Sequence, residues 1–187
     1  MKRAVAQYMM SADERRNLGP AMQNSARSFQ PRMDAAFALS LHPLSYAEAN
    51  FGVDEGLLAA GAELEVARRH FSEPLVTDLD VLELAELRPG ARSRALSREL
   101  AERYPSSTRY TPSELWEWLC VEWLVAHWDS RPDPLDDVGR LTADFGYPAW
   151  FDLYGALCGF YLIENLRARA LGELSAARDA LRRRCRA

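Results

Sequence analysis

Three polar residues near the middle of the chain, His127, Asp129 and Asp133, are of the types that bind metal ions. On a helix, however, a histidine and a carboxylate two residues apart point to different faces, so His127 and Asp129 do not converge on one ion. The stretch 129–137 is as rich in aspartate as a calcium loop, but it has Arg131 and two prolines where such a loop needs ligands and a glycine. We therefore expect no metal site, and we interpret His127 as a satisfied or surface histidine.

The residues that could act as nucleophiles also lack the patterns that catalysis requires. The three cysteines, Cys120, Cys158 and Cys185, make an odd count without metal-type spacing, and two of them lie in apolar segments. We expect them to be buried, inert thiols. No Gly-x-Ser-x-Gly elbow, P-loop or Gly-x-Gly-x-x-Gly motif occurs. The sequence thus predicts no catalytic residue and no cofactor.

The apolar stretch from Thr111 to Phe160 contains all five tryptophans, so it is the element around which the fold must be built. It opens with Thr111-Pro112-Ser113-Glu114, which has the form of a capping box with proline at the first helical position. From Leu115 to Trp128 almost every residue is apolar, a stripe too wide for a surface helix. We expect this helix to be the most buried element of the protein.

Two more helices are predicted after it. Asp133 is a suitable cap for a helix that starts at Pro134, and Gly146 suits the left-handed position at its end. Pro148 then starts another apolar helix. Because each residue type in the turn 143–148 has a local role in this scheme, we interpret the turn as structural.

The remainder of the chain also has helical periodicity. Helices are predicted from about Arg32 to the residues before His42-Pro43, over 45–51 (ended by Gly52), over 54–71, from 77 to about 87, and around Leu96 and Leu100. A long, thinly packed helix is predicted after Glu164. No segment has the alternation of a strand. The fold prediction is an all-α, irregular single-domain bundle of seven to nine helices, with residues 1–30 as a partly ordered leader and 31–187 as the helical domain.

Length and composition limit the protein class. A chain of 187 residues that is 48% apolar can bury one sizeable core, which predicts one domain. It has no run of about 18 apolar residues and no signal-peptide segment, so we expect a cytoplasmic protein that does not bind membranes. Nothing in the sequence indicates an oligomeric state. The aromatic cluster is interpreted as core packing rather than as the lining of a ligand pocket.

Charge is distributed unevenly along the chain. Residues 111–165 carry 10 acidic and 2 basic side chains, a net charge of −8, whereas residues 166–187 carry 2 acidic and 7 basic side chains, a net charge of +5. Neutralisation of the acidic stretch by the basic tail is favoured over nucleic-acid binding by that tail. The acidic side chains that the tail does not neutralise predict a face that docks on a positively charged protein, with two aromatic residues as anchors. Its predicted residues are Asp129, Asp133, Asp136, Asp137, Asp144, Asp152, Trp128 and Tyr147.

Several motifs of the chain resemble those of a bacterial family called domain of unknown function 2247. They are the Trp-Leu-rich helix 116–128, the helix start Asp133-Pro134-Leu135, and the turn Ala143-Asp144-Phe145-Gly146-Tyr147-Pro148. The entry Ser45-Tyr46-Ala47-Glu48 and the segment Leu82-Glu83-Leu84-Ala85 are also similar, so the resemblance spans about residues 32–151. The leader and the Ala/Arg-rich tail depart from the family pattern.

Three function classes follow from these patterns. The first is a non-catalytic binding protein, in particular an immunity-type protein that neutralises a bacterial toxin, by analogy with small acidic helical families of this kind. The second is a helical scaffold or adaptor. The third is an enzyme whose site is assembled from distant residues, for which a deep polar pocket would be the sign.

Overall fold

The computed structural model describes residues 27–186 except for 73–76, 107–109 and 147–162, and these described residues form helices joined by short loops. They contain no strand, and only an isolated bridge pairs Met33 with Leu58. The all-α prediction is therefore confirmed. The helices are α3 (Ala35–Leu41), α4 (Tyr46–Asp54), α5 (Ala62–Phe71), α6 (Leu79–Glu86), α7 (Ala91–Arg103), α8 (Pro112–His127), the 3-10 turn η2 (Trp128–Ser130), α9 (Pro134–Asp144) and α11 (Ile163–Arg186).

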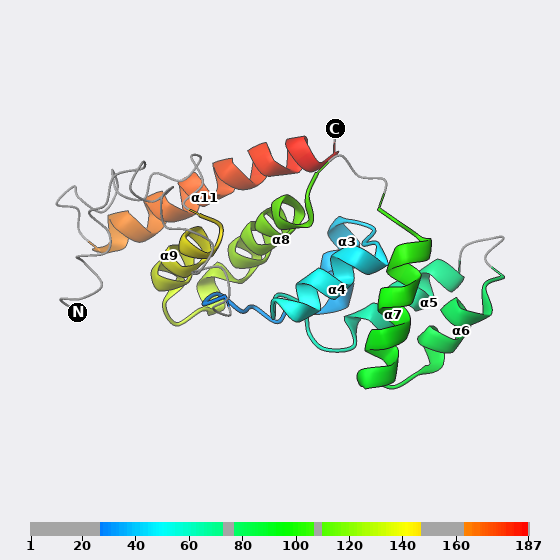
Figure 1. The fold of residues 1–187 in the computed structure, drawn as a ribbon. Helices are drawn as coiled ribbons and strands as arrows, with labels where there is room; N and C mark the ends of the chain where they lie inside the picture. Colours follow the sequence, from blue (N-terminus) through cyan, green and yellow to red (C-terminus); the bar gives the residue numbers. More distant parts are fainter. Residues whose placement is uncertain (1–26, 73–76, 107–109, 147–162, 187) are drawn as a thin grey trace, which may run out of the picture.

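The helices form two groups that meet along α8 (Figure 1). In the first group α5 packs on α6, and α4 packs on both α5 and α7. In the second group α11 lies along α8, and α9 packs against the same helix. Because α8 also contacts α4, it connects the two groups and holds the centre of the core.

Local sequence signals account for the position of α8. The hydroxyl of Thr111 accepts a hydrogen bond from the amide of Glu114 (3.3 Å), and the Glu114 carboxylate accepts one from the amide of Thr111 (2.8 Å). The predicted capping box is thus confirmed. Eight of the 16 residues of α8 are buried, more than in any other helix whose buried residues the structure describes.

The predicted boundary at Gly52 is wrong, because α4 continues through this glycine to Asp54. The indole of Trp116 lies against Gly52, and a Cβ atom there would come within 2.2 Å of the ring. The indole N–H also donates to the carbonyl of Glu48 (3.0 Å). Glycine therefore serves close packing between α4 and α8 rather than helix termination.

The predicted helix over 54–71 is wrong in its first half. Leu57 and Leu58 lie in a loop and are buried there, and α5 begins only at Ala62. Gly61 at its N-cap has a φ of +91°, in the left-handed region that favours glycine. Backbone groups of this buried loop find hydrogen-bond partners in the segment before α3, since the amide of Met33 donates to the carbonyl of Leu57 (2.9 Å).

The segment 27–34, which we call the strap, runs from the α8–α9 side of the molecule to α3 (Figure 1). Phe29 is buried in the core and packs edge-on against Trp123. Arg27 forms an ion pair with Glu55 at the end of α4 (2.8 Å), and its guanidinium lies over the ring of Phe145. The strap thereby joins the two helix groups. Residues 1–26 of the predicted leader lie outside the described residues.

The tail forms the predicted long helix, α11, which buries a narrow stripe that includes Leu174, Leu181 and Cys185. Two of its arginines pair with carboxylates of α8, Arg182 with Glu122 (2.6 Å) and Arg184 with Glu114 (2.6 Å). The predicted neutralisation of core acid by the basic tail is confirmed for these pairs.

The helix expected from Pro148, together with Cys158, lies outside the described residues. Among the described helices, none is long and apolar enough to cross a membrane.

Candidate functional site

Three of the predicted partner-binding carboxylates lie exposed where α8 gives way to α9. Asp129 belongs to η2, and Asp133 caps α9 by accepting the amide of Asp136 (3.1 Å). Asp136 is half exposed and forms an ion pair with Arg140 one turn later (2.5 Å). We call Asp129, Asp133 and Asp136 the acidic junction. Asp133 and Asp136 also have a local structural role, because the first caps α9 and the second lies in its first turn, where carboxylates are favoured.

Two other predicted carboxylates are used inside the fold. Asp137 is only 5% exposed and binds the guanidinium of Arg131 through both oxygens (2.6 and 3.2 Å). This hydrogen bond raises the pKa of Arg131. Asp144 accepts the amide of Phe29 (2.6 Å) and the hydroxyl of Ser28 (3.0 Å), so it holds the strap. The sequence placed all of these carboxylates on one face because linear proximity does not show which side chains have internal partners.

The predicted aromatic anchors also need correction. Trp128 is only 3% exposed and belongs to the hydrophobic core, so its ring is not available to a partner. The indole packs into this core from the 3-10 turn η2, which follows α8. The other predicted anchor, Tyr147, and the carboxylate of Asp152 lie outside the described residues.

Near the C-terminal end of α8 lies a group of stacked and edge-on side chains that sequence reasoning missed. The rings of Trp123 and His127 are stacked with centroids 4.4 Å apart and an interplanar angle of 21°. The guanidinium of Arg131 lies over the indole of Trp123 (5.5 Å to the ring centroid), and Phe37 of α3 meets the imidazole edge-on (5.8 Å). We call Phe37, Trp123, His127 and Arg131 the aromatic ridge, and all four are half-buried. The spacing of Trp123 and His127 was the available signal, because residues four apart share a helix face, whereas Arg131 follows η2 in an extended conformation.

The imidazole of His127 is held in one tautomer. Its Nδ1 lies 2.8 Å from the carbonyl oxygen of Trp123, and a carbonyl only accepts, so Nδ1 carries the proton in the neutral ring. Nε2 then presents a lone pair, and no hydrogen bond from the described part of the chain reaches it. The prediction that His127 is a satisfied or surface histidine is therefore confirmed, because Nδ1 has a hydrogen-bond partner within α8. Nε2 is an acceptor.

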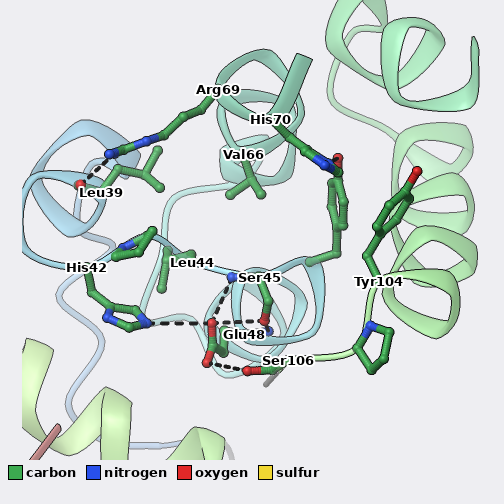
Figure 2. Close-up of a pocket in the computed structure, with 13 residues that line it drawn as sticks. Leu39, His42, Leu44, Ser45, Glu48, Val66, Arg69, His70, Tyr104 and Ser106 are labelled. Atoms are coloured by element: carbon green, nitrogen blue, oxygen red, sulfur yellow. Dashed lines mark hydrogen bonds and ion pairs between the residues drawn. The ribbon is translucent and has the colours of Figure 1, made fainter. Parts of the chain in front are cut away.

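A pocket of about 440 Å³ opens between α3, α4, α5 and the end of α7 (Figure 2). His42 and Arg69 approach it from one side, His70 and Tyr104 from the other, and Glu48 lies at its base. Sequence reasoning missed this pocket because its residues come from three helices, α3, α4 and α5, and from the loops after α3 and α7, and they share no motif.

The polar groups of the pocket bond mainly to one another. The carboxylate of Glu48 accepts the amide of Ser45 (2.7 Å) and the hydroxyl of Ser106 (3.2 Å), and it lies 3.9 Å from Nε2 of His42. Its first role is to complete the capping box of α4, which the sequence predicted. His70 in turn shares a hydrogen bond with the hydroxyl of Tyr46 (2.9 Å). These contacts position helices, and they also place a carboxylate near an imidazole.

The cysteines that the structure describes are buried, as predicted. Cys120 is fully buried in α8, and burial raises the pKa of its thiol. Burial also raises the pKa of Cys185, although the charge of Arg184 opposes this. A thiol with a raised pKa holds little thiolate, so neither side chain has nucleophilic character. Across the described residues, no group of three or more His, Cys, Asp or Glu side chains is arranged to hold a metal ion.

Comparison with known proteins identifies a family. Residues 35–161 match the model of a family described as "Uncharacterized protein conserved in bacteria (DUF2247)". No curated protein matches the chain. No solved structure matches it either.

Proposed function

Because the chain belongs to this uncharacterised bacterial family, DUF2247, whose description states no activity, we propose a function from the surface of the molecule. The proposal is a non-catalytic binding protein of the bacterial cytoplasm, and most concretely an immunity-type protein that neutralises a toxin by direct binding. Such a protein needs a complementary surface and no catalytic residues.

The observation that carries this proposal is the exposure of the acidic junction. Asp129 and Asp133 are exposed side chains, and the nearest arginine, Arg131, is already bound to the buried Asp137. The ion pair between Asp136 and Arg140 is exposed on both sides, so solvent screens it and it contributes little to folding. This end of the molecule therefore has more negative charge than its own ion pairs neutralise.

The arginines of α7 favour the same class of partner. On α7, Arg94 and Arg98 both pair with Asp54, and Arg103 pairs with Asp78 and Asp80. Arginines committed to intramolecular ion pairs are poor ligands for phosphate groups, so nucleic-acid binding is disfavoured. A basic protein surface is the complement of the acidic junction, and such charges act mainly on the rate of association.

The direct test uses the product of a toxin-like gene next to the gene for this chain. We expect co-expression of the chain to protect cells from that product, and the two purified proteins to associate more slowly as salt is raised. Reversal of two exposed carboxylates, Asp129→Lys with Asp136→Lys, should slow association at least tenfold at low salt. Asp137 is left unchanged because its reversal would place a lysine against Arg131 in a buried site.

A matched control makes the same change in charge elsewhere. Glu86 and Glu102 are exposed on α6 and α7, and the double variant Glu86→Lys with Glu102→Lys should retain protection and the association rate. If both double variants behave like the natural chain, or if association does not depend on salt, the acidic junction is not the binding surface.

The pocket supports a second candidate, an enzyme or small-molecule binder, because it brings Glu48 close to His42. The variant His42→Phe separates the two candidates. A binding protein that uses the acidic junction should still protect cells when it carries His42→Phe. A protein that acts through the pocket should lose protection with His42→Phe but retain it with Asp129→Lys and Asp136→Lys.

A further inference from the structure

The aromatic ridge adjoins the acidic junction in the chain and in space. His127 is the last residue of α8, and Asp129 lies two residues later in η2. Arg131, which covers the indole of Trp123, precedes Asp133 by two residues and reaches Asp137 in α9. The stacked rings and the exposed carboxylates are therefore neighbours at this end of α8, and Arg131 links the rings to α9.

We infer that the aromatic ridge is the centre of a docking surface for a basic protein segment, and that Nε2 of His127 accepts a hydrogen bond from an arginine of that segment. The inference rests on the proposed function, because it takes the acidic junction as the rim of the same surface. Charge complementarity selects the occupant, since exposed carboxylates around the ridge attract cationic side chains.

The geometry of His127 suits an arginine donor. The carbonyl of Trp123 holds the proton on Nδ1, so Nε2 offers a lone pair that a guanidinium N–H can use. The imidazole is also held by Trp123 on one face and by Phe37 at its edge, so binding would cost it little further rotamer freedom. Arginine presents five N–H donors in a rigid fork, which allows one to reach Nε2 while others face a carboxylate.

The position of the ridge fits the usual arrangement of binding energy. Hot spots are enriched in aromatic and arginine residues near the middle of an interface, and charged residues around them act mainly on encounter. Trp123 and His127 are half-buried, and Asp129, Asp133 and Asp136 are exposed in the segment that follows them. The acidic junction is therefore expected to control the association rate, and the ridge the lifetime of the complex.

The test measures binding of the full chain to a fluorescent decapeptide of alternating arginine and glycine, by anisotropy at low salt. The variant His127→Phe keeps an aromatic ring on Trp123 but removes the acceptor, and we expect it to weaken binding at least tenfold. Trp123→Leu should weaken binding to a similar degree. Phe71→Ala changes an exposed aromatic residue on α5 and should bind like the natural chain.

The outcomes separate this inference from the proposed function. If Asp129→Lys with Asp136→Lys abolishes binding while His127→Phe binds normally, the acidic junction holds and the role of the ridge is overturned. If the natural chain does not bind the peptide, or Phe71→Ala weakens binding as much as the ridge variants do, the inference is also overturned. Circular dichroism of each variant confirms that the fold is retained, and His127→Phe decides the question if Trp123→Leu fails to fold.

Discussion

Gly52 of α4 and Trp116 of α8 are in direct contact, and a Cβ atom at Gly52 would lie 2.2 Å from Cζ2 of the indole. Trp116 is fully buried, and its indole N–H donates to the backbone carbonyl of Glu48, which lies in α4 like Gly52. The two helix groups therefore meet through a glycine that faces the largest kind of side chain. A larger residue at position 52 would have to displace the indole of Trp116.

We predict that Gly52→Ala destabilises the protein by about 1–3 kcal/mol, because overpacking at the indole exceeds the gain in helix propensity. Urea unfolding followed by circular dichroism measures the change. Gly172→Ala is the control, because a Cβ atom there meets nothing within 4 Å and the residue is exposed on α11. It should stabilise the protein by up to about 1 kcal/mol. Equal stabilities for both variants would mean that the contact with Trp116 is not formed.

The tryptophans of α8 should differ in their contributions to stability. Trp116 is fully buried, so Trp116→Ala should cost about 3–5 kcal/mol. Trp123 is half-buried and stacks on His127, so Trp123→Ala should cost less, about 1–3 kcal/mol. Denaturant midpoints measured for both variants test this order. A larger loss for Trp123→Ala would place that residue in the core and not on the ridge.

The ion pair between Arg182 and Glu122 should matter more than the one between Arg184 and Glu114. Glu122 is 6% exposed and also accepts the indole N–H of Trp118 (2.9 Å), so Arg182→Met leaves a buried carboxylate without its cation. We expect a loss of about 1–3 kcal/mol. The pair of Arg184 is exposed, and Arg184→Met should cost less than about 1 kcal/mol.

A double-mutant cycle checks the assignment. If the buried charge causes the loss, Glu122→Gln combined with Arg182→Met should be more stable than Arg182→Met alone. Additive losses in thermal or chemical unfolding would show that Arg182 acts through packing of its stem.

Asp144 should be a structural residue of the strap and not a partner-binding one. Asp144→Ala removes the acceptor of the Phe29 amide and of the Ser28 hydroxyl, and we expect a loss of about 1–3 kcal/mol. Hydrogen exchange at the amide of Phe29 should accelerate in the variant, while exchange within α7 stays slow. Ser28→Ala removes one of the two bonds and should have a smaller effect. Full stability of Asp144→Ala combined with loss of partner binding would instead make Asp144 part of the interface.

Stability should fall in acid partly because of Asp78. Burial opposes its ionisation, but hydrogen bonds from the Asp80 amide and the Tyr104 hydroxyl, together with the charge of Arg103, lower its pKa below the ordinary value. A carboxyl whose pKa is lower in the folded state stabilises the fold above its unfolded pKa, and this is lost as pH falls through the folded pKa. The natural chain should therefore lose more stability between pH 7 and pH 3 than Asp78→Asn, by about 1 kcal/mol. Asp129→Asn, an exposed change, should follow the natural chain.

Much of the helical layout follows from short-range signals in the sequence. Thr111 with Glu114 and Ser45 with Glu48 form their capping boxes as predicted, and Asp133 caps α9. Gly146 adopts the predicted positive φ of 77°. These features depend on residues three or four positions apart, so the spacing of side chains along the chain is enough to predict them.

Only the tertiary structure decided which residues face one another across helices. The role of Gly52 depends on an indole 64 positions away, and the burial of Asp137 and Trp128 depends on how η2 turns into α9. The same is true of Phe37, which joins the aromatic ridge from α3. The sequence by itself determined the capped starts of α4, α8 and α9, the buried character of α8 and the charge imbalance. Which carboxylates and rings are exposed was decided only by the packing of the helices, because the partners of a side chain are close in space and leave no pattern along the chain.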